Sequence, residues 1–270
     1  MTLFEALSAA RQRIDRLDAR LLLQYATGCT HADLLARPET PVGEMAGRQF
    51  FEWVERRAGG EPLAYLVGET EFRGRVFQVS PAVLIPRPET EVLIETALDK
   101  LRACTQPCAL DLGTGSGIVA ISIALECPEA KIAAVDLKKE AILLARNNAA
   151  RLGAAVDFRE GDWFGPVAGE RYAVIVSNPP YVAAGDPHLA LNGLPFEPAV
   201  ALTDGGDGLN CIRQIVAGAP DHLQPGGWLI FEHGYDQGEA SRNLLCEAGF
   251  KDAFTLPDLA GIDRVSGAHL

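Results

Sequence analysis

The chain has no long apolar run, no compositionally biased segment and no clustered cysteines. Its longest uncharged apolar stretch, residues 112–125, is too short to span a bilayer and is interrupted by glycines. No basic start followed by an apolar run opens the sequence, so we expect no secretory signal. Of the six cysteines only Cys104 and Cys108 are close together, at a spacing unusual for zinc. These absences predict a cytoplasmic protein without a metal site or a membrane segment.

The sequence also has fewer basic than acidic side chains. The sequence has 24 Lys and Arg against 36 Asp and Glu, which gives a net charge of −12. An acidic surface repels phosphate backbones, so a large nucleic-acid footprint is not expected, although a local basic groove is not excluded. With 48% hydrophobic residues, the 270-residue chain can form one large domain or a medium domain with a small companion.

The first 70 residues show helical periodicity and no strand-like alternation. Apolar residues recur at helical spacing up to Gly28, which predicts one helix there, and shorter helices are expected at 31–36 and 43–58. Residues 71–85 are β-favouring with turn signals and predict a hairpin. Pro86-Arg87-Pro88 then forces an extended backbone before a helix opens at Glu89-Thr90. We therefore expect a helical bundle over 1–70 and a hairpin linker over 71–90.

Residues 91–270 alternate between strand and helix patterns. Strands are expected at 108–112, 131–136, 155–159, 172–177 and 228–233, with further strand-like segments at 250–256 and 262–268. Helices are expected at 90–103, 117–126, 138–152, 208–222 and 237–248. This alternation predicts an α/β domain with a mostly parallel sheet, in which ligands bind at the carboxyl ends of the strands.

A glycine-rich turn follows the first of these strands. It reads Asp111-Leu112-Gly113-Thr114-Gly115-Ser116-Gly117. The glycine spacing differs from the G-x-G-x-x-G of dinucleotide-binding turns and suits a nucleoside without phosphates. A turn whose glycines serve only packing is the alternative.

Acidic residues follow the next two strands. Asp136 lies 23 residues beyond Gly113 and could accept hydrogen bonds from both hydroxyls of a ribose, or cap the following helix, or do both. Asp162 and Trp163 could accept a hydrogen bond from an adenine amino group and stack on its ring. Trp163 could equally be a packing residue.

The strand at 172–177 runs directly into Asn178-Pro179-Pro180-Tyr181. The two prolines fix their φ angles and remove two N–H donors, which presents carbonyl groups on a stiff arch. The Asn178 side-chain oxygen and the Pro179 carbonyl could then accept both hydrogens of a planar amino group, and Tyr181 could stack on it. A merely rigid turn is the alternative reading.

These motifs resemble the class I S-adenosylmethionine-dependent methyltransferases that act on planar amino nitrogens. Several further segments resemble the HemK/PrmC-type peptide chain release factor glutamine N(5)-methyltransferases over nearly the whole chain. They are Gly60–Leu66, Glu71-Phe72, Leu84–Thr90, Phe196-Glu197-Pro198 and Glu232-His233-Gly234. The resemblance implies a Rossmann-like class I methyltransferase sheet with a small N-terminal helical bundle and a β-hairpin linker. It also implies S-adenosylmethionine as methyl donor, and the glutamine of the Gly-Gly-Gln loop of class 1 release factors as substrate.

The resemblance also assigns roles to residues. It places the cofactor at Gly113–Gly117, Asp136, Trp163 and Asn178, to which the strand-end motifs add Asp111 and Asp162. The expected catalytic group is Asn178, Pro179 and Tyr181. The substrate side adds Pro180, with Arg87, Glu89 and Glu197 as further candidates; either acid could line a glutamine pocket or serve as a cap or surface charge. It implies a release factor as partner, and neither a membrane nor a nucleic acid. An N6-adenine nucleic-acid methyltransferase, which shares the Asn-Pro-Pro-Tyr form, is the alternative function; a nucleotide-linked oxidoreductase and a non-catalytic module are weaker ones.

Overall fold

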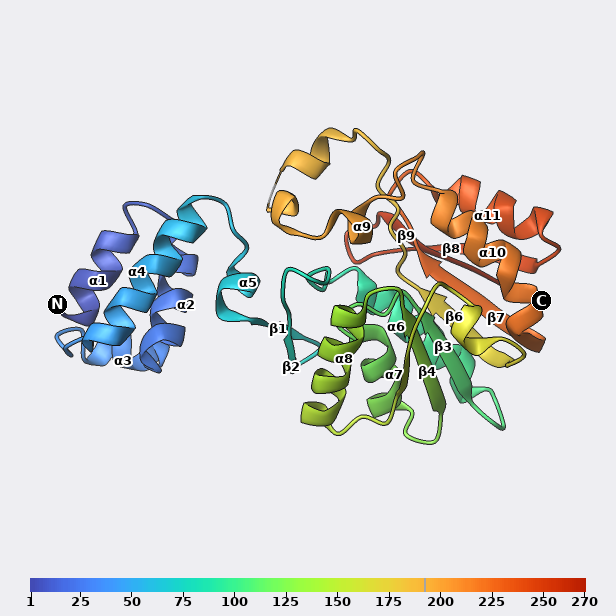
Figure 1. Cartoon of the computed structure of the whole chain (residues 1–270), viewed down its shortest axis with the longest axis horizontal. Coiled ribbons are helices and arrows are strands. Elements are labelled where there is room, and N and C mark those ends of the chain that lie inside the picture. Colours follow the sequence, from blue (N-terminus) through green and yellow to red (C-terminus); the bar gives the residue numbers. More distant parts are fainter. Residues whose placement is uncertain (192) are drawn as a thin grey trace. The chain divides into compact units, whose positions relative to one another are not determined.

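A computed structural model describes residues 1–191 and 193–270, and these divide into two compact units (Figure 1). The first unit contains Met1–Glu69 and Ala190–Phe196, and the second contains Thr70–Leu189 and Glu197–Leu270. The helical pattern did not predict that a segment as distant as Ala190–Phe196 would join the first unit. The expected hairpin linker at 71–90 falls entirely within the second unit.

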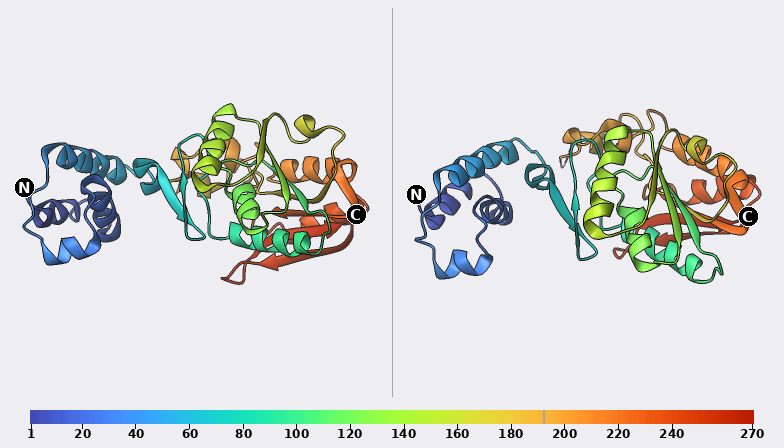
Figure 2. Two further views of the ribbon diagram at one scale, coloured as in Figure 1. Left: turned by 90° about the horizontal axis from the view of Figure 1, so that it is seen from below. Right: turned by 60° about the horizontal axis from the view of Figure 1, so that its bottom comes forward.

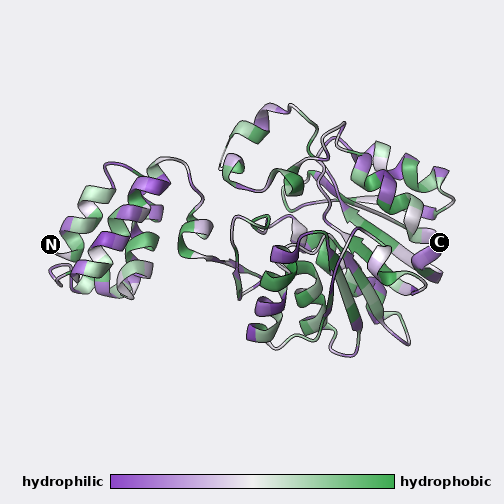
Figure 3. Cartoon of the chain, in the orientation of Figure 1, coloured by the Kyte–Doolittle hydropathy of each residue, from purple (hydrophilic) through white to green (hydrophobic). Residues whose placement is uncertain are grey.

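The first unit is a small helical bundle. Its elements are α1 (Leu3–Ala10), α2 (Arg16–Thr27), α3 (His31–Ala36), α4 (Glu44–Ala58), α5 (Leu63–Val67) and the 3-10 turn η3 (Leu194–Phe196). The core is formed by apolar side chains from α1, α2 and α4, among them Leu22, Leu23 and Phe50, which are fully buried. Figure 3 shows these helices with apolar and polar faces, as expected for helices that each bury one side.

The prediction of one helix up to Gly28 was wrong. The chain forms α1 and α2 with a break at residues 11–15, because Asp15 accepts a hydrogen bond from the Leu17 N–H and caps a new helix. The break changes the buried face, so that Phe4 is 59% exposed and Leu17 is 51% exposed. Apolar periodicity alone did not reveal the capping residue.

The second unit is built on a seven-stranded sheet in the order β5-β4-β3-β6-β7-β9-β8. The strands are β3 (Cys108–Leu112), β4 (Lys131–Asp136), β5 (Asp157–Glu160), β6 (Tyr172–Ser177), β7 (Leu223–Glu232), β8 (Lys251–Pro257) and β9 (Asp263–His269). The strands from β5 to β7 are parallel, and β9 pairs antiparallel with β7 and β8. This confirms the Rossmann-like sheet, and the chain order reverses between β3 and β6, where such sheets bind ligands.

Helices cover both faces of the sheet (Figure 2). They are α6 (Thr90–Arg102), α7 (Ile118–Glu126), α8 (Lys139–Leu152), α9 (Ala199–Leu202), α10 (Asn210–His222) and α11 (Gly238–Glu247), with the 3-10 turns η1 (Gly165–Val167) and η2 (Pro187–Ala190). One apolar core lies between the sheet and α6, α7 and α8, and a second lies between the sheet and α10 and α11. Burial on both faces explains the nearly continuous apolar run of β6.

Two strand predictions differ from the structure in extent. The hairpin contains only β1 (Glu69–Phe72) and β2 (Arg75–Gln78), and Val83–Ile85 form no strand. The Ser80-Pro81 turn and the prolines after Ile85 remove the backbone geometry and donors that a ladder needs. In contrast β7 begins at Leu223 rather than at Trp228. Its register with β6 shifts between Leu223 and Trp228, so the Gly226-Gly227 pair lies in an irregular part of the strand instead of ending it.

Gly117 is where the glycine turn meets two packed helices. Its φ is +83°, and an added Cβ would lie 2.8 Å from Ile121 Cδ1 and 3.0 Å from Ala145 Cβ. We therefore expect Gly117→Ala to lower the unfolding free energy by about 2–5 kcal/mol, from left-handed strain and overpacking together. Gly153→Ala is the matched control, because Gly153 has a φ of +73° and no neighbouring atom within 4 Å. It should lose only the strain, about 1–2 kcal/mol. Equal losses in urea denaturation would contradict the packing role.

Candidate active site

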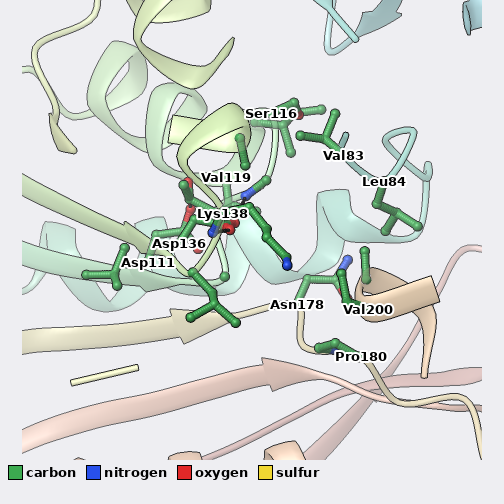
Figure 4. A pocket seen from close by; sticks show the side chains of 18 of the residues that line it. Val83, Leu84, Asp111, Ser116, Val119, Asp136, Lys138, Asn178, Pro180 and Val200 are labelled. Atoms are coloured by element: carbon green, nitrogen blue, oxygen red, sulfur yellow. Dashed lines mark hydrogen bonds between the residues drawn. The ribbon is translucent and has the colours of Figure 1, made fainter. Parts of the chain in front are cut away.

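A cavity of about 290 Å³ lies in the second unit at the carboxyl ends of β3, β4 and β6 (Figure 4). Most of the residues predicted for the cofactor line it. They are Asp111, Gly113, Thr114, Gly115, Ser116, Asp136, Asp162, Trp163 and Asn178, joined by Pro180 and Arg87 from the predicted substrate side. Figure 4 shows Asp111, Asp136 and Lys138 on one side of the cavity and Asn178, Pro180 and Val200 on the other. The topology thus brings together strand ends far apart in the sequence.

The glycine turn is held against the end of β4. The N–H groups of Gly113 and Thr114 donate to the Val135 carbonyl at 2.9 Å and 3.0 Å, and the Gly115 N–H donates to Asp136 Oδ2 at 2.8 Å. Gly115 has no atom within 4 Å of an added Cβ, so its backbone is open for a ligand. Gly115 therefore faces free space, whereas Gly117 serves packing.

Asp136 keeps acceptor capacity toward the cavity. Its Oδ1 accepts from the Lys138 N–H at 2.9 Å and its Oδ2 from the Gly115 N–H. A carboxylate offers about four lone-pair positions, so two remain for a ligand. Burial raises the pKa of Asp136, and the bonds from Lys138 and Gly115 oppose that rise.

Asp111 is buried at the end of β3 beneath the turn. Its Oδ2 accepts from Thr114 Oγ1 at 2.6 Å and from the Ala120 N–H at 3.2 Å. Burial raises its pKa to about 7, and these two bonds oppose the rise. Asp111 thereby ties the turn to the first residues of α7.

Trp163 forms one wall of the cavity in an unusual backbone conformation. Its φ is +38°, a left-handed value for a bulky residue, and it follows Gly161 and Asp162 in the loop after β5. Its ring also packs on the core beneath α10. Trp163 therefore lines the cavity and packs on the core at the same time.

The Asn-Pro-Pro-Tyr segment contributes two of its four residues to the cavity wall, Asn178 and Pro180. Pro179 is buried. Asn178 Nδ2 donates to Thr90 Oγ1 at 3.2 Å. Tyr181 donates its hydroxyl to Glu232 Oε1 at 3.1 Å, and its burial raises its pKa. Among the described residues of the cavity wall, neither Pro179 nor Tyr181 appears.

Glu232 and Thr90 join the site although the sequence motifs did not select them as site residues. Glu232 ends β7, is fully buried and accepts from Thr90 Oγ1 through Oε2 at 2.8 Å. Burial raises its pKa to about 7, and the Thr90 and Tyr181 bonds oppose the rise. The signal for both was present, since the segments Leu84–Thr90 and Glu232-His233-Gly234 carry the family resemblance.

Of the remaining substrate candidates, only Arg87 lines the cavity. Glu197 is buried, pairs with Arg87 and accepts from the Ile85 N–H at 3.0 Å. Arg87 lines the cavity, whereas Glu89 is the N-cap residue of α6 and makes no side-chain capping bond. Glu197 therefore ties the segment before α9 to the linker and holds Arg87 at the cavity.

The buried carboxyl of Glu232 makes the folded state sensitive to pH. Folding raises the pKa of Glu232 from 4.5 to about 7, so the folded state holds this proton more tightly than the unfolded state does. The tighter binding stabilises the folded state fully below pH 4.5, and this stabilisation is lost as pH rises through about 7. Glu232→Gln should therefore raise the unfolding free energy relative to wild type by at most about 3 kcal/mol at pH 8, and by much less at pH 4.5. Urea denaturation of both proteins at the two pH values measures this difference. A gap that does not grow with pH would contradict it.

Two family profiles match the chain. The PrmC N-terminal domain matches residues 3–68, and the methyltransferase small domain matches residues 88–207, which include the glycine turn and Asn178–Tyr181. The chain is 50% identical over 264 residues to the release factor glutamine methyltransferase of Burkholderia pseudomallei, covering 95% of this chain and 93% of the relative. It is 49% identical to that of Bordetella pertussis, with 100% of both chains covered. The chain belongs to the release factor glutamine methyltransferase family.

Membership of this family makes the protein a methyltransferase, in agreement with the resemblance drawn from its motifs. The fold is shared with solved methyltransferases of low identity. A methyltransferase from Pyrococcus furiosus is 20% identical with a TM-score of 0.53, covering 72% of this chain and 87% of that one. A T. thermophilus 16S rRNA N2 G1207 methyltransferase is 20% identical with a TM-score of 0.54, covering 74% and 49%.

Neither metal-binding clusters nor membrane spans appear in the part of the chain that the structure describes. Over residues 1–191 and 193–270, no group of three or more His, Cys, Asp or Glu side chains could hold a metal ion. No helix in these ranges is both long and apolar enough to cross a bilayer.

Proposed function

We propose that this enzyme transfers a methyl group from S-adenosylmethionine to the side-chain amide nitrogen of the glutamine in the Gly-Gly-Gln loop of class 1 release factors. The observation that carries the proposal is the identity of about half of all residues to relatives of that name over the full length of the chain. The relatives support this protein substrate over the nucleic-acid alternative. Translation takes place in the cytoplasm, so the proposed substrate agrees with the expected localisation.

The residues at the cavity fit S-adenosylmethionine. Gly113 and Gly115 leave the backbone open, Asp136 retains free acceptor positions for ribose hydroxyls, and Asp162 and Trp163 can meet the adenine. A carboxylate at Asp136 would repel a 2′-phosphate, which agrees with a nucleoside that carries none. When bound, S-adenosylmethionine would supply an electrophilic methyl group attached to a sulfonium.

Asn178 is the residue that we propose grips the substrate amide. Its Nδ2 donates to Thr90, which leaves its Oδ1 free to accept one hydrogen of a carboxamide. Pro179 lies between the cavity-wall residues Asn178 and Pro180, and its carbonyl would accept the second hydrogen, so the flat amide would be held at both N–H groups. An amide nitrogen is a weak nucleophile because its lone pair is delocalised. Holding it in a reactive orientation can lower the barrier by about 7–11 kcal/mol.

The two acceptors also meet the charge that develops on nitrogen. Preorganised acceptors stabilise a growing positive charge for the same reason that donors stabilise an oxyanion. The methylated cationic nitrogen is strongly acidic, and its proton can leave to solvent after transfer. Hence the scheme needs no histidine or lysine as general base.

The helical unit at residues 1–70 is proposed to dock the release factor. Its match to the PrmC N-terminal domain and its core separate from the sheet support a role distinct from catalysis. The expected division into a docking domain at 1–70, a linker at 71–90 and a catalytic domain at 91–270 is part of this proposal.

One experiment tests the proposed function directly. The enzyme is offered labelled S-adenosylmethionine with a class 1 release factor and, in parallel, with duplex and single-stranded DNA. We expect label on the release factor and an increment of about 14 Da on its Gly-Gly-Gln peptide, since one hydrogen is replaced by CH₃, and no label on DNA. A release factor with Gln replaced by Ala in that loop is the control. Label on DNA, or none on either substrate, would refute the proposal.

A further inference from the structure

A chain of buried hydrogen bonds connects the proposed substrate grip to a carboxyl group outside the cavity. Asn178 Nδ2 lies 3.2 Å from Thr90 Oγ1, and Thr90 Oγ1 lies 2.8 Å from Glu232 Oε2. The other carboxyl oxygen, Oε1, lies 3.1 Å from the hydroxyl of Tyr181. Thr90 is 2% exposed and Glu232 is fully buried, so water has little access to replace these partners. These hydrogen bonds connect the end of β6, the first residue of α6 and the end of β7.

The protonation states of these groups determine which group donates and which accepts in each hydrogen bond. An ionised carboxyl can only accept, so Thr90 must donate its single hydroxyl hydrogen to Glu232. The Thr90 oxygen can then only accept, and its neighbour at Asn178 must be the NH₂ group rather than the carbonyl. The oxygen and the NH₂ group of a carboxamide lie in one plane, on opposite sides of the Cβ–Cγ bond. The Asn178 oxygen is therefore turned away from Thr90.

We infer that Glu232, acting through Thr90, is a positioning residue that fixes which end of the Asn178 carboxamide faces the substrate. This inference rests on the proposed function, in which Asn178 Oδ1 accepts from the substrate amide. A reversed carboxamide would present two N–H donors to the N–H groups of the substrate, and the two would repel. The orientation is thus a condition for binding the amide in the reactive geometry.

The surroundings of Glu232 determine the pH at which its carboxyl is ionised and the hydrogen bonds have a fixed direction. From the elements packed on it, Glu89 at the start of α6 opposes its ionisation, while Arg264 on β9 and the hydroxyls of Thr90 and Tyr181 favour it. Burial outweighs these and raises the pKa of Glu232 to about 7. When Glu232 takes up a proton, one of its oxygens becomes a donor, and the hydroxyl that meets it must accept instead. In the molecules where that hydroxyl is Thr90, its hydrogen is free to point at Asn178. The Asn178 carboxamide then turns to present its oxygen to Thr90.

Substitutions at Thr90 separate the hydroxyl from the shape of the side chain. We expect Thr90→Val to lower kcat for the release factor about tenfold, the loss of roughly one hydrogen bond, with an unchanged cofactor Kd. Thr90→Ser keeps the hydroxyl and should recover most of that rate. Thr96→Val is the matched control, because Thr96 lies on the same helix with its hydroxyl bonded to the Val92 carbonyl at 2.7 Å. It should keep the wild-type rate. A Thr90→Val enzyme as fast as Thr96→Val would overturn the inference.

A pH profile adds a readout that a purely structural role would not move. At saturating cofactor and release factor, kcat of the wild type should fall as pH is lowered through about 7, the pKa of Glu232. In Thr90→Val the link to Asn178 is cut, so this fall should disappear. The same fall in both enzymes would overturn the inference.

A measurement without substrate separates this inference from the proposed function. The side-chain NH₂ signals of ¹⁵N-labelled Asn178 are assigned by their loss in Asn178→Ala. Their exchange with water should be slow in wild type and Thr96→Val and fast in Thr90→Val. Fast exchange in the wild type would overturn the inference about Glu232 and Thr90 even if the release factor is methylated. Slow exchange with no methylation of any release factor would support this inference and refute the proposed substrate.

Discussion

Replacing Asn178 by alanine is expected to lower kcat for the release factor by about 10²–10³, while the cofactor still binds. The reason is that the substitution removes a preorganised acceptor that meets developing charge, whereas Gly115 and Asp136, which hold the cofactor in our proposal, are unchanged. Single-turnover kinetics at saturating cofactor measure the chemical step, and calorimetry measures the cofactor Kd.

Ser177→Ala is the matched control for this prediction. Ser177 is the residue before Asn178, and its buried hydroxyl bonds to the Leu112 carbonyl at 2.8 Å without reaching the cavity. Its loss disturbs the same strand end but leaves the acceptor in place, so we expect a rate within a few-fold of wild type. An Asn178→Ala enzyme with the rate of Ser177→Ala would remove Asn178 from the mechanism.

Replacing Asp136 by alanine is expected to weaken cofactor binding by about 1.5–3 kcal/mol, or roughly 10- to 150-fold in Kd. Asp136 supplies charge-assisted acceptors to the cavity and also fixes the Gly115 N–H, so both contributions are lost together. Asp136→Asn retains one acceptor oxygen and should bind with intermediate affinity.

Glu160→Ala controls for the loss of a carboxylate nearby. Glu160 is paired with Asp136 across β4 and β5 but does not line the cavity. We expect its cofactor Kd to stay close to the wild-type value in calorimetry. If Asp136→Ala also left the Kd unchanged, the ribose assignment would be refuted.

The sequence predicted the parts of the fold that depend on local pattern. The strands at Cys108–Leu112, Lys131–Asp136 and Tyr172–Ser177 have the expected bounds, because mainly apolar runs flanked by turns are typical of buried parallel strands. The errors lie where a single residue outweighs the pattern. Asp15 caps a second helix inside an unbroken periodicity, and β7 runs through Gly226-Gly227, where composition would end the strand.

The motifs after the strands predicted the cavity wall for the same reason, since parallel strand ends share one edge of the sheet. Partnerships across long sequence separations could not be predicted in this way. Thr90 and Glu232 are 142 residues apart in the chain, and neither has a motif that indicates a mutual hydrogen bond. Such pairs follow from the packing of α6 on the sheet, which periodicity does not specify.

A crystal structure of the enzyme with S-adenosylhomocysteine and a glutamine-containing release factor peptide would show how the substrate amide is held. We expect the glutamine side-chain nitrogen to lie within about 3.2 Å of both Asn178 Oδ1 and the Pro179 carbonyl oxygen, with the carboxamide plane held between them. A glutamine side chain bound elsewhere in the cavity, or an Asn178 that presents its NH₂ group to the peptide, would contradict it.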